Sequence, residues 1–239
     1  MKKKFVVAHL VIIFIFGGCA SRRAHKNREM AHSYLTQASL DINAYNEKND
    51  TDSLRKALNN IDESLNYHPT IAARGMKATL LFQLGKFVES KKLFEDLLKE
   101  KKLPKAKRAD TLNNYAIVLY QLGHTPEAQQ TWRDLINNPH YISPELAYFN
   151  LGYVAFNEAA AAHTKEQQEQ AQQRLNLALS YFKSAVTISR EYVNSYFFMG
   201  QTLAALNRIE EARDCFRMIL TISPEHANAI TMLKSLEKM

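Results

Sequence analysis

The chain has 239 residues, a formal net charge of +7 and two cysteines, and 46% of its residues are hydrophobic. Two cysteines are too few for the disulfide framework that stabilises small secreted scaffolds. Without the three lysines at positions 2–4, 28 basic residues face 24 acidic ones, and this charge of +4 is too mild to indicate a nucleic-acid-binding protein.

The N-terminus has the pattern of an export signal. Lys2–Lys4 are positively charged, Phe5–Phe16 form an apolar segment too short to span a bilayer, and Gly17–Cys19 follow. A cysteine directly after two small residues resembles the bacterial lipobox, in which the thiol is lipidated and the signal is cut just before it. This resemblance implies a signal peptide at 1–18 and a lipid, including palmitate, on Cys19. The alternative is an ordinary secretory signal that contains a cysteine.

The residues after Cys19 indicate where the lipidated chain goes. Neither Ala20 nor Ser21 is the Asp that favours retention in the inner membrane. By resemblance we therefore expect a lipid-anchored protein in the outer membrane of a Gram-negative cell, facing the periplasm. Residues 19–27 are predicted to be a polar tether and 28–239 a repeat domain.

A pattern of small and large apolar residues recurs along 28–239 with a period of about 34 residues. Each unit is predicted to be two antiparallel helices, because small residues at positions 8 and 20 let the helices approach closely. The first unit is degenerate. Its first helix, at about 28–45, has no small residue where Tyr45 stands, and its second helix fits the pattern through Ala57, Ile61, Ser64 and Pro69.

Four further units follow at 71–104, 109–142, 145–192 and 193–226, and Gly123 is expected to end a helix in the second of them. The most complete pattern is in 193–226, with Tyr196, Met199, Gly200, Leu203, Ala212, Phe216, Ile219 and Pro224. These residues resemble the signature of the tetratricopeptide repeat (TPR). We predict an all-α TPR solenoid of about five helix-turn-helix repeats, closed by a capping helix at 227–239 through Ile230 and Leu233.

The fourth repeat fits only if 14 residues, roughly 159–174, are inserted between its halves. This insertion consists mainly of Ala, Gln, Glu and Lys, which favour helix. It is therefore predicted to lengthen both helices by about two turns each, or about 10 Å. The alternative is a flexible loop, and in either case the insertion projects from one edge of the solenoid.

The first helix of each TPR repeat lines the concave face of the solenoid. The residues predicted to form a partner-binding groove on this face are Phe82, Asn113, Ile117, Tyr120, Phe149, Tyr153, Phe156, Phe197 and Gln201. Their aromatic character favours an apolar or amphipathic peptide. The alternative is that some of these rings pack against one another. A clamp for a terminal carboxylate is excluded, because position 5 of the repeats carries Gly75, Asn113, Phe149 and Phe197 in place of cations.

Six basic residues lie between Lys99 and Arg108. This run is predicted to be a solvated connection between helices, and the alternative is docking onto acidic headgroups or an acidic partner segment. Cys215, beside Phe216 in the last repeat, is predicted to be a packing residue. The sequence has no HExxH, Cys-x-x-Cys, GxSxG or glycine-rich phosphate motif, so we expect no enzymatic activity, metal or cofactor.

The segment 112–152 carries a narrower resemblance. It contains Leu112-Asn113-Asn114-Tyr115-Ala116, Asn138-Pro139-His140-Tyr141-Ile142-Ser143-Pro144 and Asn150-Leu151-Gly152. This segment resembles the type IV pilus lipoproteins of the PilF/PilW/Tgl kind. The resemblance implies a pilotin, which helps the pilus secretin reach or assemble in the outer membrane, with a secretin subunit as protein partner. The alternative is a periplasmic TPR lipoprotein that recruits cell-wall hydrolases or proteases.

Overall fold

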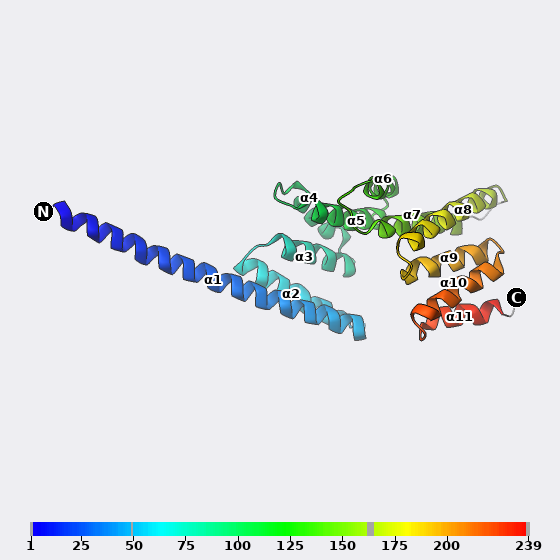
Figure 1. Ribbon diagram of the computed structural model, residues 1–239, viewed down its shortest axis with the longest axis horizontal. Helices are drawn as coiled ribbons and strands as arrows, with labels where there is room; N and C mark the ends of the chain where they lie inside the picture. The colour runs from blue at the N-terminus through cyan, green and yellow to red at the C-terminus, as the bar shows by residue number, and fades with distance from the viewer. Residues whose placement is uncertain (1, 49, 162–164, 238–239) are drawn as a thin grey trace. The chain divides into compact units, whose positions relative to one another are not determined.

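The fold is known from a computed structural model that describes the backbone of residues 2–48, 50–161 and 165–237, and the side chains of 21–48, 50–161 and 167–237. These residues form eleven helices and no strand (Figure 1). They divide into two compact units, Met1–Leu103 and Pro104–Met239. The predicted all-α TPR solenoid is confirmed: consecutive helices pack in pairs, and a single helix follows the last pair.

The first unit contains two helix pairs. They are α1 (Lys2–Lys48) with α2 (Thr51–Tyr67), and α3 (Ile71–Gln83) with α4 (Phe87–Lys99). Side-chain caps begin two of these helices: Asp50 accepts a hydrogen bond from the Asp52 amide, and Thr70 accepts one from the Ala73 amide. The 71–104 repeat is therefore present as α3 and α4.

The first repeat differs from its prediction in length and register. Its first helix, expected at about 28–45, is part of the much longer α1, so the predicted tether at 19–27 is helical. The small residue that the pattern lacked at Tyr45 is supplied two turns earlier by Ala38, which is fully buried with Ala57 and Ile61. The side chain of Cys19 lies outside the described side chains.

The second unit contains three pairs and a cap. The pairs are α5 (Lys105–Gln121) with α6 (Thr125–Ile136), α7 (Pro144–Ala160) with α8 (Lys165–Ile188), and α9 (Val193–Ala205) with α10 (Ile209–Ile222). The cap is α11 (Ala227–Leu236). It buries Ala229 and Leu236 and packs partly buried Leu233 on the core as predicted, and Ile230 is also partly buried.

Glycines at position 8 bring the paired helices together, as the pattern predicts. A Cβ atom on Gly152 would lie 2.7 Å from the Phe182 ring, and one on Gly200 would lie 2.7 Å from the Phe216 ring. Both phenylalanines are fully buried. The close approach of α7 to α8 and of α9 to α10 therefore depends on the missing side chain.

Three turns between paired helices share one backbone conformation. Gly85, Gly123 and Asn207 have φ values of 74°, 84° and 59°. In each case the following amide donates to the carbonyl five residues earlier, at 2.8 to 2.9 Å. This left-handed conformation favours Gly, or Asn among the other residues, and it confirms the predicted role of Gly123 in ending α5.

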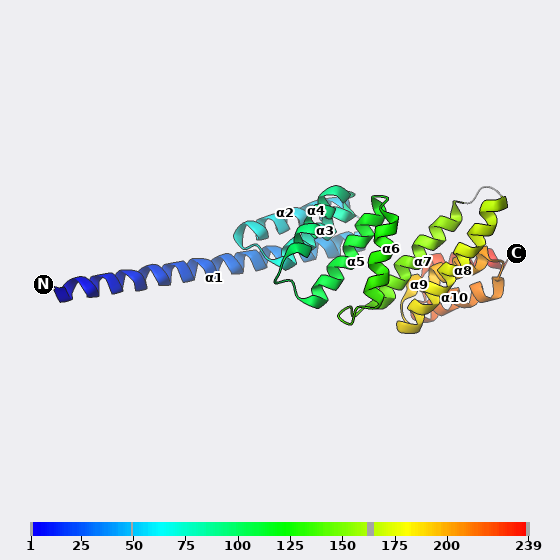
Figure 2. The same ribbon diagram turned by 90° about the horizontal axis from the view of Figure 1, so that it is seen from above.

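The insertion in the fourth repeat lengthens both helices, but unequally. α7 has 17 residues against 13 in α9, and α8 has 24 against 14 in α10. Figure 2 shows the two long helices side by side. The predicted equal division is therefore wrong: most of the added length is in α8, because the insertion contains no Pro or Gly to place the turn at its centre.

No helix in the described part of the chain is both long enough and apolar enough to cross a membrane.

Candidate functional site

Aromatic side chains gather where α7 packs against α9. The ring of Phe198 lies 5.0 Å from Tyr153 and 5.7 Å from Phe149, measured between centroids. It also lies 5.7 Å from both Phe156 and Phe197. All four contacts are edge-to-face, a geometry that the ring quadrupole favours. Phe198 was not among the predicted groove residues, because the pattern assigned neighbouring Phe197 to that face.

Two further rings extend this group. Tyr192, which precedes α9, packs on Phe149 at 5.3 Å, and Tyr120 of α5 lies 6.3 Å from Tyr153. The Tyr120 hydroxyl accepts a hydrogen bond of 3.1 Å from Asn157. We call the partly buried side chains of Phe149, Tyr153, Phe156, Tyr192, Phe197 and Phe198 the aromatic surface.

The aromatic surface is electrically neutral. Burial raises the pKa of Tyr192, opposed by its hydrogen bond to Asn194 and reinforced by Glu145. Tyr192 therefore keeps its proton at neutral pH. The rings contact one another, which was the alternative to an open groove. They also remain partly exposed, so they offer apolar area to a partner.

Asn113 has a structural role inside the second unit. It is buried, and its Oδ1 accepts hydrogen bonds of 3.2 Å from both Trp132 Nε1 and Asn150 Nδ2. These contacts connect α5, α6 and α7. Asn113 was predicted to line an open groove, but the structure places it in the polar interior of the helix stack.

The other predicted groove residues lie in several places. Ile117 packs partly buried against the core of α5 to α7, and Gln201 is partly buried in α9. The ring of Phe197 also contacts Phe216 at 5.8 Å. Phe82 belongs to the first unit, where it packs on Phe87 at 5.4 Å. The rings of α7 and α9 therefore form the compact part of the predicted site.

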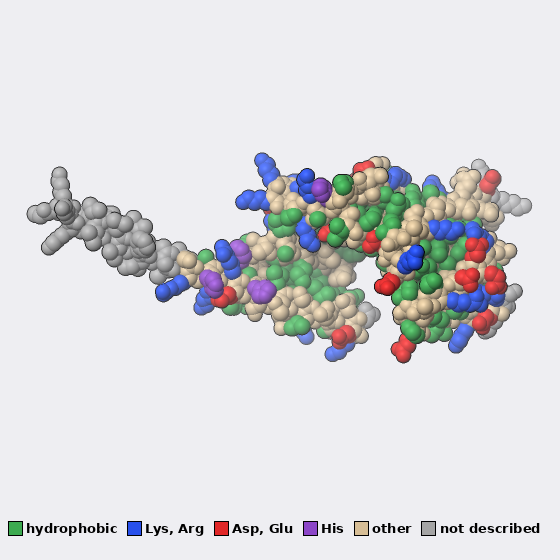
Figure 3. All heavy atoms as spheres, viewed as in Figure 1, with side chains coloured by type: hydrophobic (Ala, Val, Ile, Leu, Met, Phe, Trp, Pro, Cys, Tyr) green, Lys and Arg blue, Asp and Glu red, His purple; other side chains and the backbone are tan. Residues whose placement is uncertain are grey.

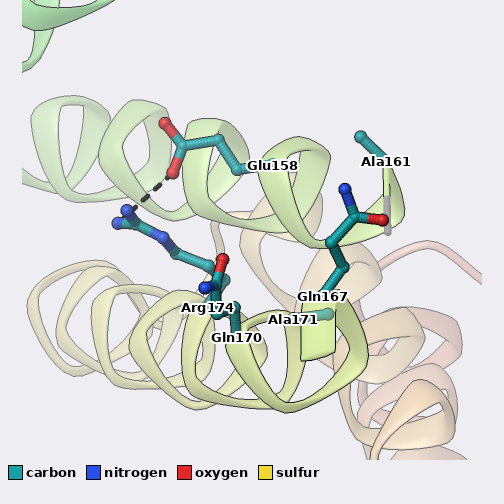
Figure 4. A pocket seen from close by; sticks show the side chains of 6 residues that line it. All are labelled: Glu158, Ala161, Gln167, Gln170, Ala171 and Arg174. Atoms are coloured by element: carbon teal, nitrogen blue, oxygen red, sulfur yellow. Dashed lines mark ion pairs between the residues drawn. The ribbon is translucent and has the colours of Figure 1, made fainter. Parts of the chain in front are cut away.

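The insertion forms a polar hollow between α7 and α8, with a volume of about 250 Å³ (Figure 4). Its lining residues are Glu158, Ala161, Gln167, Gln170, Ala171 and Arg174. Glu158 and Arg174 face each other across it, with a carboxylate oxygen 3.3 Å from the guanidinium. This ion pair and the amides of the insertion make its surface hydrophilic.

The basic run between Lys99 and Arg108 is only partly a connection. α5 begins at Lys105, so Lys105–Arg108 form its first turn, where we expected a loop. Acidic neighbours partly offset the charge: Lys99 lies 3.1 Å from Asp96, and Lys107 lies 3.4 Å from Asp110.

Cys215 is buried, in agreement with its predicted packing role. Burial, with smaller contributions from Asp214 and Glu211, raises the pKa of its thiol to about 12. Since the thiolate is the reactive form, this residue is poorly suited to nucleophilic or redox chemistry. Among the described residues, no group of three or more His, Cys, Asp or Glu side chains is arranged to hold a metal ion.

Comparisons with known proteins identify the repeats. Residues 193–226 and 109–134 match tetratricopeptide repeat models. A comparison with curated proteins gives no match. The two matched segments are the units in which the small and large apolar residues follow the repeat pattern most fully.

Solved structures with similar folds include two type IV pilus proteins. PilF from Pseudomonas aeruginosa has a TM-score of 0.61 at 17% identity, and the match covers 89% of this chain and 85% of that one. PilW, described as a widely conserved type IV pilus biogenesis factor, has a TM-score of 0.59 at 16% identity, with 90% of each chain covered.

A third similar structure is a thermophilic TPR protein from Thermus thermophilus. Its TM-score is 0.56 at 21% identity, with 70% of this chain and 81% of that chain covered. At such identities the likeness establishes the fold alone. The chain is a TPR solenoid, a scaffold typical of non-enzymatic proteins that bind other proteins.

Proposed function

We propose that this protein is a pilotin, an assembly factor for the type IV pilus secretin that acts by binding a secretin segment. The observation that carries the proposal is the likeness to PilF and PilW over about nine-tenths of the chain. The sequence resemblance in 112–152 points to the same proteins. That segment forms the second half of α5, all of α6 and the first half of α7, and it leads directly into the aromatic surface.

The aromatic surface is the proposed binding site. Its rings are held by contacts with one another, so little side-chain freedom is lost when a partner binds. Neutral rings without a cationic clamp suit an apolar or amphipathic segment within a chain better than a terminal carboxylate. Phe149 and Tyr153 are central, because each contacts both the other and Phe198.

A lipid on Cys19 would complete the function. Several acyl chains on one residue give stable membrane anchoring. Anchoring in the outer membrane, facing the periplasm, would raise the effective concentration of the binding surface for secretin subunits arriving there. Mass spectrometry of the membrane-purified protein should find a diacylated or triacylated N-terminal Cys19. An unmodified thiol or a different mature N-terminus would refute this part of the proposal.

Two experiments test the pilotin function. In a deletion strain, heat-stable secretin multimers and surface pili should both be lost. Complementation with a Phe149→Ala, Tyr153→Ala variant should fail, because removing two central anchors is expected to weaken binding by about 2–4 kcal/mol. The matched control is Tyr148→Ala, Tyr181→Ala, which removes another pair of partly buried, contacting rings, 6.4 Å apart on α7 and α8.

The outcomes separate the alternatives. Both variants should keep their helicity, and the control should restore multimers and pili. Normal multimers and pili in the deletion strain would contradict the pilotin function and favour a scaffold for cell-wall enzymes. Lost multimers with full complementation by the Phe149/Tyr153 variant would keep the function but move the site elsewhere on the protein.

A further inference from the structure

The net charge of this protein is concentrated in seven residues. Arg22, Arg23, Lys26 and Arg28 lie within 22–28, where no acidic residue occurs. Apart from these four and the lysines at positions 2–4, the chain has 24 basic and 24 acidic residues. The rest of the protein is therefore formally neutral, and the positive charge is a local feature of one segment.

This segment is an exposed stretch of α1. The side chains of residues 21–26 and Arg28 are exposed, and the first buried side chain of the described residues is Ala31. Figure 3 shows basic and histidine side chains gathered on α1 where its described side chains begin. Among the described side chains, no ion pair involves any of the four cations, although His25 lies 3.5 Å from Glu29.

We propose that residues 22–28 form an electrostatic docking segment for a bilayer surface that contains anionic lipids. A cluster of basic residues beside a membrane anchor attracts acidic headgroups, and each residue strengthens binding severalfold. The choice of a membrane as occupant rests on the proposed anchor at Cys19, whereas the charge and exposure of the segment do not depend on it.

The geometry of α1 suits this role. At about 1.5 Å per residue, a helix places Arg22 about 5 Å and Arg28 about 14 Å along its axis from Cys19. Arg22 and Arg23 are within the Debye length of about 8 Å at physiological salt, and Arg28 is within about two Debye lengths. Arg22 and Arg23 would therefore lie where headgroup charges act most strongly, with Lys26 and Arg28 contributing less. The exposed helix up to Ala31 would separate the packed unit from the bilayer by about 18 Å.

The second basic region is a weaker candidate for the same role. Two lysines of the run between Lys99 and Arg108 have carboxylate neighbours, and Arg74 lies 2.7 Å from Glu100 within it. This run therefore serves as a matched control, because four of its lysines can be neutralised with the same change in net charge.

Vesicle flotation tests the proposal with the unlipidated chain 20–239, which keeps every buried side chain that the structure describes. The vesicles are phosphatidylcholine alone or phosphatidylcholine mixed with phosphatidylglycerol. The first variant is Arg22→Gln, Arg23→Gln, Lys26→Gln, Arg28→Gln. The control variant is Lys101→Gln, Lys102→Gln, Lys105→Gln, Lys107→Gln, and circular dichroism checks that both stay folded.

The unaltered chain should bind the phosphatidylglycerol vesicles, bind phosphatidylcholine vesicles weakly, and lose binding at about 0.5 M salt. The first variant should bind at least about tenfold more weakly, and the control should change by less than about twofold. No binding to the anionic vesicles, or a loss confined to the control variant, would overturn the proposal. So would tighter binding to duplex DNA than to these vesicles.

This test is independent of the proposed function. Because the chain carries no lipid and no secretin is present, a failed pilotin assay leaves the vesicle result unaffected. Equally, a chain that does not bind anionic vesicles could still be lipidated on Cys19 and bind a secretin.

Discussion

Deleting residues 160–173 tests how the fourth repeat is built. The deletion joins Ala159 to Arg174 and restores the spacing of the other repeats. In that spacing Ala159 takes the turn position that Gly85, Gly123 and Asn207 hold elsewhere, at φ values of 74°, 84° and 59°. The shortened repeat should therefore fold, but with an alanine where the backbone must be left-handed.

The expected energies follow from this geometry. A residue with a Cβ atom costs about 1–2 kcal/mol in the left-handed conformation, and glycine avoids this cost. The deletion combined with Ala159→Gly should thus be more stable than the deletion alone by about 1 kcal/mol. Little burial is lost in either, because the described side chains of the deleted stretch, 160–161 and 167–173, are exposed except for partly buried Ala171.

The same substitution in the full-length chain provides the control. There Ala159 is part of α7, where glycine is less favourable than alanine by about 1 kcal/mol. Urea unfolding followed by circular dichroism should therefore show that Ala159→Gly stabilises the shortened chain and destabilises the full-length one. A change of the same sign in both backgrounds, or a shortened chain without cooperative unfolding, would refute the reasoning.

Two other predictions concern packing. Gly200→Ala should destabilise the chain by about 1–2 kcal/mol, because the steric cost of a Cβ atom 2.7 Å from the buried Phe216 ring exceeds the gain in helix propensity. Gly75→Ala should instead stabilise the chain by about 0.5–1 kcal/mol, because its Cβ atom would lie 4.0 Å from Leu97, an ordinary contact distance. Equal shifts in the two unfolding midpoints would contradict this. The Cys215 thiol, with its pKa raised to about 12, should resist alkylation at pH 8 until urea unfolds the chain, and rapid labelling of the native state would show that it is exposed. The pKa of the Cys215 thiol is higher in the folded chain than its unfolded value of about 9, so above pH 9 the unfolded chain loses the thiol proton first and the free energy of unfolding falls. In urea unfolding, a Cys215→Ala variant should show a smaller fall in this free energy above pH 9.

The repeats could be predicted because helix packing restricts a few positions strongly. Gly152 and Gly200 lie against buried rings, so a larger residue would force the ring or the paired helix to move. Gly123 marks a turn for a separate reason, its left-handed backbone. Such local constraints are visible in one sequence, since each depends on a particular residue type at a fixed distance along the chain.

The features that could not be predicted depend on choices among similar residues. Phe197 and Phe198 are adjacent and chemically alike, and only the crossing of α7 and α9 decides that Phe198 is the centre of the aromatic surface. The buried role of Asn113 depends on Trp132 and Asn150, which are contributed by two other helices. The length of α1 was also missed, because no Pro or Gly between Ser21 and Lys48 marks a start, and the polar composition of 19–27 indicated a tether.

The aromatic surface joins stability and recognition in the same side chains. Phe149 contacts Phe182, which fills the space left by Gly152, and Phe198 contacts both. A ring fixed by this core can present its exposed edge without the entropy cost of ordering it on binding. For this reason, a substitution of Tyr153 reports on partner binding more directly than a substitution of Phe198, which would also disturb the core. Tyr153 contacts Tyr120, Phe149 and Phe198, which are all partly buried, whereas Phe198 contacts the buried ring of Phe182 directly.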